Sequence, residues 1–184
     1  ILESIYWHPG LRWVIDRIHV CAPIHFTNIR RNEVKDVISA RKVKAVMEKG
    51  QGELYLATPE SIQQRAAMVL TNVRYVIDAH FVMTDNAAPG DNPGKFQDII
   101  KRRLERGQFY SMPYFGTREF PAHFRRCETL PPCPEDLKGI RDLGWMLWDM
   151  DYRDPENITP KFFRASLRDG VMTVPPPGSG EVRG

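Results

Sequence analysis

The stretch 68-MVLTNVRYVIDAHFVMT-84 decides the expected fold, because it is the longest strand-like run in the chain. Alternation of side chains gives it one mainly apolar face, formed by Val73, Tyr75, Ile77, Ala79, Phe81 and Met83. The run 11-LRWVIDRIHV-20 has the same branched and aromatic character, with one irregular step in its alternation. Two strands are therefore expected, separated by the less regular residues 21–66.

A helix is predicted after the second strand, in 92-NPGKFQDIIKRRLERG-107. Asn92 suits the cap, Pro93 the first helical position and Gly107 the left-handed residue after the last turn. At 100° per residue an apolar stripe forms, into which Arg103 falls as an exception; its members are Phe96, Ile99, Ile100 and Leu104.

Lys95 lies in the first turn of this helix, beside backbone N–H groups that have no partner within the helix. A cation is slightly unfavourable there unless an anion is nearby. The position suits a phosphate ligand, and a solvated lysine beside a helix cap is the alternative.

The remaining segments are expected to be shorter or less regular. Residues 1–8 look like the end of a helix that Pro9 and Gly10 terminate, and a helix is expected around 40–48. Residues 109–124 look extended but broken by proline and glycine, 143–150 look like a strand, and 162–175 look like a hairpin with its turn at 168–170.

The order of elements predicts an α+β fold of the ferredoxin-like type. A helix end followed by strand, strand, helix and strand matches a β-α-β-β-α-β unit that lacks its first strand. We expect residues 1–126 to form this domain, with a mobile insertion at about 35–66, and residues 127–184 to form a small antiparallel β subdomain with a tail. Because the chain opens with ILESIYW and no methionine, its natural N-terminus is expected to be missing.

Composition indicates a globular protein rather than a membrane or disulfide-rich one. The chain has 184 residues, of which 42% are hydrophobic and 27% charged, and no apolar run approaches the roughly 18 residues of a membrane span. Neither a signal peptide nor a membrane partner is expected. Three cysteines without CxxC spacing favour a reducing cytoplasm and indicate neither a disulfide framework nor a zinc site.

Charge is distributed unevenly along the chain. Residues 1–126 hold 19 Lys and Arg against 13 Asp and Glu, whereas residues 127–184 hold 7 against 10. The basic part is therefore the candidate for an anionic partner such as nucleic acid.

Known catalytic spacings are missing from the sequence. The five histidines show no paired metal-ligand spacing, no nucleophile elbow or glycine-rich nucleotide loop occurs, and the carboxylates are dispersed. We therefore expect no metal and no cofactor. Tyr6 and Lys95, both near helix ends, could instead serve RNA cleavage without a metal, since tyrosine and lysine can transfer protons and lysine can stabilise a charged phosphate.

Several strings resemble the subtype I-C (Dvulg) Cas-five-d family of CRISPR-associated proteins, within the RAMP superfamily. They follow one another over nearly the whole chain: 3-ESIYWHP-9, 13-WVIDRIHV-20, 26-FTNIRRNEV-34, 63-QQRAAMVLTNVRYVIDAHF-81, 92-NPGKFQDIIKRRLERGQ-108, 113-PYFGTREFPA-122 and 142-DLGWMLWDMD-151. The resemblance implies a ferredoxin-like fold with a C-terminal β subdomain. It also implies metal-independent cleavage of the CRISPR precursor transcript at the repeat hairpin, after which the protein keeps the 5′ handle of the guide RNA within a type I-C Cascade complex.

The resemblance also implies an active site formed by a tyrosine in the IYW string and a Lys-His pair at the start of the second helix. Tyr6 and Lys95 match two of these positions, but Phe96 occupies the histidine position and cannot transfer a proton. His8 is our hypothetical substitute. On a continuous helix it would point about 200° away from Tyr6, so the substitution requires the helix to end before Pro9.

Two functions remain open at this point. The first is an endoribonuclease that stays bound to its product, and the alternative is a guide-RNA-binding structural subunit without catalysis. An unrelated RNA-binding ferredoxin-like domain is a third possibility. For either of the first two, the expected phosphate contacts are basic residues: Arg30, Arg31, Lys101, Arg102, Arg106 and Arg118.

Overall fold

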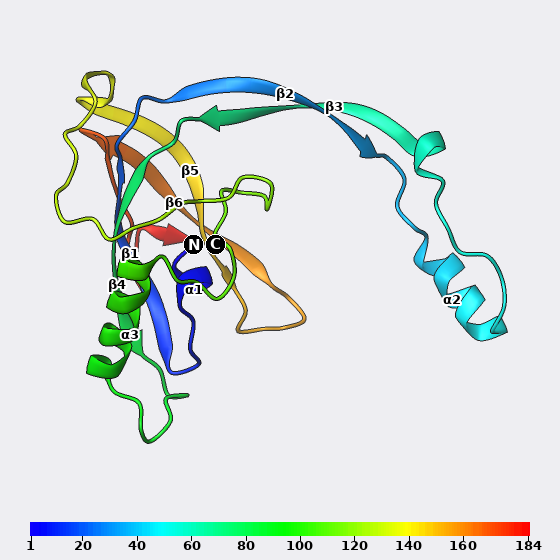
Figure 1. The fold of residues 1–184 in the computed structure, drawn as a ribbon, viewed down its shortest axis with the longest axis horizontal. Coiled ribbons are helices and arrows are strands. Elements are labelled where there is room, and N and C mark those ends of the chain that lie inside the picture. The colour runs from blue at the N-terminus through cyan, green and yellow to red at the C-terminus, as the bar shows by residue number, and fades with distance from the viewer. The chain divides into compact units, whose positions relative to one another are not determined.

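A computed structural model describes residues 1–184 as a mixed α/β protein with antiparallel sheets. The chain forms two compact units (Figure 1). The first contains Ile1–Pro23 and Val73–Gly184, and the second contains Ile24–Asn72. None of the helices is long and apolar enough to cross a membrane.

The first unit is built on a six-stranded sheet. Five strands follow the order β4-β1-β7-β6-β5, and β8 pairs with β6. Its elements are α1 (Leu2–Ile5), β1 (Leu11–Val20), β4 (Tyr75–Met83), α3 (Pro93–Arg106), the 3-10 turn η2 (Glu135–Leu137), β5 (Ile140–Asp151), β6 (Thr159–Arg168), β7 (Val171–Thr173) and β8 (Val182–Arg183).

The strand predicted at 11–20 is confirmed as β1, and so is its irregular step. β1 pairs antiparallel with β4 from Leu11 opposite Met83, and the register shifts between Ile15 and Arg17. A bulge at this place reverses which side chains face the core, and this accounts for the break in the alternation.

The run 68–84 is two strands rather than one, which corrects the expectation of a single long strand. β3 ends at Thr71 and β4 begins at Tyr75. Between them Asn72 has a φ of 52°, a left-handed conformation outside the extended region of regular strand residues. Of the predicted apolar face, Tyr75, Ile77, Ala79 and Phe81 are half-buried and Met83 is exposed. Phe81 packs with Trp13 against the core residue Phe96.

The second unit is a two-stranded antiparallel ribbon, in which β2 and β3 run side by side and α2 follows β2 (Figure 1). It contains β2 (His25–Val34), α2 (Ala40–Lys49), the 3-10 turn η1 (Thr58–Ser61) and β3 (Ile62–Thr71). The helix expected around 40–48 is thus present. Residues 35–66, expected as an insertion, lie inside this larger unit.

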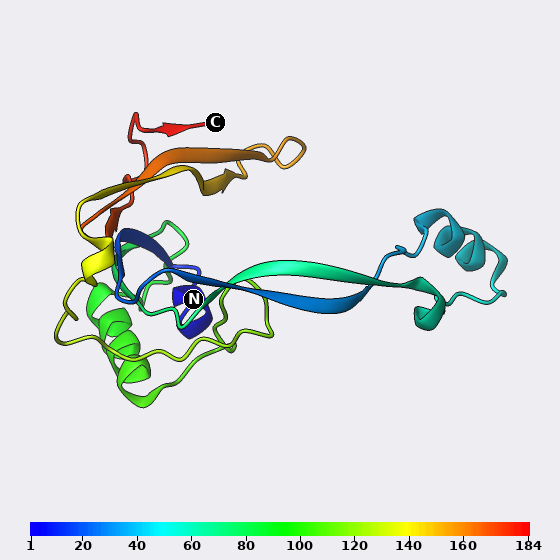
Figure 2. The same ribbon diagram turned by 90° about the horizontal axis from the view of Figure 1, so that it is seen from above.

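The structure divides the chain differently from the expected boundary after residue 126. β7 pairs with both β1 and β6, so the C-terminal strands continue the same sheet as β1 (Figure 2). Figure 2 also shows β5 and β6 side by side, as their pairing requires. The change in composition near Cys127 marks a long connection, 107–134, and not a break between compact units.

The hairpin predicted at 162–175 and the interrupted extended chain predicted at 109–124 are both present. The turn between β6 and β7 has positive φ at Asp169 (50°) and Gly170 (75°), as a type I′ turn requires. Residues 109–124 form only an isolated bridge between Tyr114 and Pro121. No regular strand follows α3 there.

Helix α3 has the expected caps and buries its apolar stripe. The Asn92 side chain accepts a hydrogen bond from the Lys95 backbone N–H at 2.9 Å, and Gly107 adopts a φ of 62°. Phe96 is completely buried and packs with Tyr6 and Leu11 in the core. Truncating a buried phenylalanine to alanine typically costs about 3–5 kcal/mol, so this contact is a main attachment of α3 to the sheet.

Candidate active site

Tyr6 and His8 lie on the same side of the chain that leaves α1. The helix ends at Ile5, and Tyr6 is already extended, with φ −150° and ψ 120°. Residues two apart in extended chain point the same way. Both rings accordingly contact Phe96, with centroid distances of 6.0 Å for Tyr6 and 4.9 Å for His8. The condition set for His8, that the helix end before Pro9, is met.

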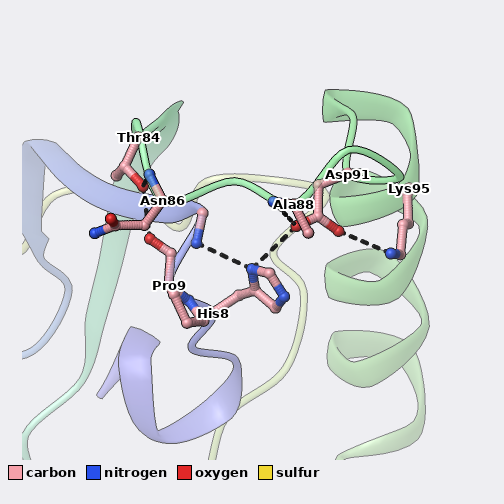
Figure 3. Close-up of polar contacts among 8 residues, drawn as sticks. His8, Pro9, Thr84, Asn86, Ala88, Asp91 and Lys95 are labelled. Carbon is pink, nitrogen blue, oxygen red and sulfur yellow. Dashed lines mark hydrogen bonds and ion pairs between the residues drawn. The ribbon is translucent and has the colours of Figure 1, made fainter.

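Lys95 is held at the start of α3 by a carboxylate of the protein itself. Its Nζ donates to Asp91 Oδ1 at 2.8 Å (Figure 3). The Lys95 side chain is 48% exposed, whereas that of Asp91 is 2% exposed. The hydrogen bond and the charge of Asp91 raise the pKa of Lys95 above its ordinary value. The lysine is therefore a cation at neutral pH, on a side chain that is about half exposed.

Asp91 is the site residue that sequence reasoning missed. Its Oδ2 accepts the Ala88 backbone N–H at 2.9 Å and lies 3.7 Å from His8 Nδ1. The hydrogen bond from Lys95 lowers the pKa of Asp91, and the one from Ala88 acts in the same direction. The available signal was the spacing in 91-DNPGK-95, which puts a carboxylate four residues before a first-turn lysine.

The contacts of Arg103 account for an arginine within the apolar stripe of α3. Its guanidinium lies 5.1 Å from the centre of the Tyr6 ring and donates a hydrogen bond to the Ile5 carbonyl. Tyr6 is 7% exposed, and its backbone carbonyl accepts from Trp13 Nε1 at 2.9 Å. Burial raises the pKa of the Tyr6 phenol, while the charges of Lys95 and Arg103 oppose the rise. Tyr6 is thus fixed in place and stays protonated at neutral pH.

Phe96 fills the position that the family resemblance assigns to histidine. Its ring also lies 6.2 Å from that of Phe81, so it is enclosed by aromatic neighbours. His8 packs on this ring and remains partly exposed, with 32% of its side chain accessible. The imidazole of His8 therefore lies beside Phe96, the residue at the position of the family histidine.

The predicted phosphate contacts are distributed over both units. Lys101, Arg102 and Arg106 are exposed on α3, and Arg118 is exposed in the connection that follows. Arg30 and Arg31 are neighbours in β2 and therefore point to opposite faces of the ribbon. Arg30 is exposed and Arg31 half-buried. Within the first unit the structure places Tyr6 and His8 against Phe96 and connects Lys95 to His8 through Asp91. No three His, Cys, Asp or Glu side chains are placed to hold a metal ion.

Comparison with known families identifies the family of this chain. The Cas_Cas5d family model, described as CRISPR-associated protein (Cas_Cas5), matches residues 1–175. The chain belongs to the Cas5d family. The resemblance drawn from the sequence strings is thereby confirmed.

Two curated Cas5d relatives align with almost the whole chain. The protein is 45% identical over 188 residues to the CRISPR pre-crRNA endoribonuclease Cas5d of Mannheimia succiniciproducens, covering 100% of this chain and 83% of that protein. It is 31% identical over 194 residues to the CRISPR pre-crRNA endoribonuclease Cas5d of Thermus thermophilus, covering 95% and 76%. A crystal structure described as that of a CRISPR-associated protein matches with a TM-score of 0.65, at 19% identity, over 100% of this chain and 80% of that one. That last likeness concerns the fold alone.

Proposed function

We propose that this protein is an endoribonuclease that cleaves CRISPR precursor RNA at the repeat hairpin. The observation that carries the proposal is the cluster of Tyr6, His8 and Lys95 around Phe96. The curated Cas5d relatives, both named pre-crRNA endoribonucleases, support the substrate class.

The reaction is an internal transesterification. The 2′-oxygen loses its proton and bonds to phosphorus, the bond from phosphorus to the 5′-oxygen breaks, and the 5′-oxygen takes up a proton. The products are a 2′,3′-cyclic phosphate and a free 5′-hydroxyl. Such a step needs a proton acceptor, a proton donor and a positive charge near the phosphate.

Lys95 and Tyr6 suit the donor and charge-stabilising roles. Asp91 raises the pKa of Lys95, and burial raises that of Tyr6, so neither group is a base at neutral pH. Lys95 is the more exposed of the two and offers its ammonium to the phosphate. The 5′-oxygen takes its proton from one of these two groups.

His8 suits the acceptor role that Phe96 leaves vacant. It is partly exposed and contacts the Phe96 ring, and Asp91 links it to Lys95. The extended conformation of Tyr6 puts His8 and Tyr6 on one side of the chain. This arrangement supports the substitution of His8 for the family histidine.

The second unit supplies an excess of positive charge for RNA. Residues 24–72 hold eight Lys and Arg against five Asp and Glu, whereas the first unit holds 18 of each. The net charge of +3 is therefore carried by the second unit. We assign phosphate contacts to the exposed Arg30 and to Arg31, and further contacts on the first unit to Lys101, Arg102, Arg106 and Arg118. The bound product would be the 5′ handle of the guide RNA, and the assembly a type I-C Cascade.

A non-catalytic, guide-RNA-binding subunit is the second candidate. The observation that favours it is Phe96, which is completely buried and carries no proton at the position of the family histidine. Under this alternative the basic residues retain their role and the Tyr6 cluster serves stability only.

We also propose that β1, β4 and α3 belong to a ferredoxin-like unit. β1 and β4 are antiparallel, and α3 follows β4 and packs Phe96 against the core. β4 lies at the sheet edge, which is where the first strand of such a unit would pair.

Incubation with the matching repeat RNA in EDTA tests the proposed function. We expect a single cleavage in the repeat, with a 2′,3′-cyclic phosphate on the upstream product. Binding of the hairpin without any cleavage would favour the structural subunit instead. The cyclic end is identified by its resistance to phosphatase until acid opens the ring.

A further inference from the structure

The loop before α3 directs the carboxylate of Asp91 toward the protein interior. Thr84 Oγ1 donates to the Pro9 carbonyl at 2.6 Å (Figure 3). The Thr84 backbone N–H donates to the Gly10 carbonyl at 3.0 Å. The bond from the Ala88 N–H to Asp91 then closes the end of the loop. These contacts join the loop to residues 9–10 and leave the Asp91 side chain only 2% exposed.

A carboxylate that is withdrawn from water must be compensated by partners. Asp91 has two hydrogen-bond donors, Lys95 Nζ on Oδ1 and the Ala88 N–H on Oδ2. Losing a hydrogen-bond donor from such a buried carboxylate costs free energy. The carboxylate therefore favours the single arrangement in which both donors are kept. The ammonium of Lys95, on a long and flexible side chain, is thereby held at one position on Asp91.

The second oxygen of Asp91 also faces His8. In the structure His8 Nδ1 accepts the Gly10 N–H at 3.0 Å, so the neutral ring carries its proton on Nε2. Asp91 Oδ2 lies 3.7 Å from the same Nδ1. Exchange of the ring proton from Nε2 to Nδ1 through solvent, together with a shift of the ring toward Asp91, would replace the Gly10 contact by an Nδ1–H donated to Asp91. That second arrangement leaves Nε2 free to accept a proton.

We propose that Asp91 is a positioning residue for RNA cleavage, which holds the Lys95 ammonium in place and stabilises the His8 tautomer that accepts the 2′-hydroxyl proton at Nε2. This assignment rests on the proposed function. When the 2′-oxygen bonds to phosphorus, its proton moves to Nε2, and the resulting imidazolium donates Nδ1–H to the Asp91 carboxylate. A carboxylate orients and stabilises the histidine of serine hydrolases in the same way.

Single-turnover cleavage by the Asp91→Asn variant is the first test. The amide keeps the size of the side chain and the acceptor for Ala88 but loses the charge. We expect the cleavage rate to fall by roughly ten- to a hundredfold, the range typical of lost orienting groups. Binding of a repeat RNA with 2′-deoxyribose at the scissile nucleotide should not weaken, because the variant is more positive by one charge.

The matched control is Asp85→Asn, which makes the same charge change at an exposed position of the same loop. It should cleave at the wild-type rate. Asp91→Asn cleaving as fast as this control would overturn the assignment. So would a parallel loss of cleavage, RNA binding and melting temperature, because that pattern marks a purely structural role.

A second measurement needs no RNA and separates this inference from the proposed function. Trace acetylation at pH 8, followed by peptide mass spectrometry, gives the reactivity of Lys95 relative to the exposed Lys101 of the same helix. The Asp91→Asn variant, which lacks the anion, should show a relative reactivity of Lys95 that is about threefold higher or more, because more of the Lys95 amine is unprotonated. An unchanged ratio would overturn the anchoring of Lys95. A changed ratio in a protein that does not cleave its repeat would reject the endoribonuclease and retain the anchoring.

Discussion

Arg103 shows how a single charged residue can stabilise the site from within an apolar stripe. Its guanidinium donates to the Ile5 carbonyl and lies over the Tyr6 ring, so it joins the end of α1 to α3. Tyr6 therefore has a fixed ring position. The cost of placing an arginine on this face is offset by the hydrogen bond and the cation–π contact.

Replacing Arg103 by methionine should lower the free energy of unfolding by about 1–3 kcal/mol, because the Ile5 carbonyl loses its donor. Urea denaturation measures this change, with Arg102→Met, at an exposed position of α3, as the control. Equal stabilities of the two variants would mean that the Arg103 contacts contribute nothing to the attachment of α1.

Asp91 could not be inferred from residue type alone. Its burial depends on contacts between 84–91 and 8–10, which are distant in the sequence and become neighbours only because β1 and β4 pair. Lys95 and Tyr6, by contrast, were accessible to sequence reasoning, since a helix cap and a family string mark their positions. The contact of His8 with Phe96 depends on the end of α1 at Ile5, because the extended chain after it directs Tyr6 and His8 to the same side.

The elements that sequence reasoning placed well are those specified by local signals. The caps of α3, the step in β1 and the turn between β6 and β7 each depend on a few adjacent residues. The break at Asn72 was missed because apolar alternation continues through it in 68–84. Strand order was not accessible either, since pairing of β7 with β1 joins residues about 150 positions apart.

The chain just before β1 approaches the loop before α3 closely enough to require glycine at position 10. A Cβ there would lie 2.7 Å from the Ala87 Cα and 3.2 Å from His8 Nδ1. Gly10→Ala should therefore displace the loop, lower the free energy of unfolding by about 1–3 kcal/mol and slow cleavage.

Thermal unfolding and single-turnover cleavage together check this expectation. Gly90→Ala is the control in the same loop, because a Cβ there meets nothing within 4 Å. If Gly10→Ala matched Gly90→Ala in both measurements, the loop would not depend on this close approach.

At the scale of the whole molecule, the excess of positive charge and the proposed catalytic groups belong to different compact units. The cluster of Tyr6, His8 and Lys95 lies in the first unit, which has equal numbers of basic and acidic residues, and the excess of positive charge lies in Ile24–Asn72. The sequence-based division at residue 126 hid this separation, because it joined the basic ribbon to the segments that hold Tyr6 and Lys95.

The Arg30→Ala variant should bind repeat RNA more weakly and with a smaller dependence on salt. Each lost phosphate contact reduces the slope of log K against log salt concentration by roughly 0.7–0.9. Lys138→Ala, in the first unit and paired with Glu135 at 2.7 Å, is the control and should keep the wild-type slope. Identical slopes for both variants would remove Arg30 from the RNA contacts.

The most direct test of the account is single-turnover cleavage of the repeat RNA by Lys95→Ala and His8→Ala, compared with Gln97→Ala at an exposed position of α3. Loss of a charge stabiliser or a general base typically costs about a hundredfold or more. We predict such a loss for both variants, a wild-type rate for Gln97→Ala, and binding of the 2′-deoxy repeat within about tenfold of wild type throughout. Wild-type cleavage by both Lys95→Ala and His8→Ala would contradict the assignment of the active site to the cluster around Phe96.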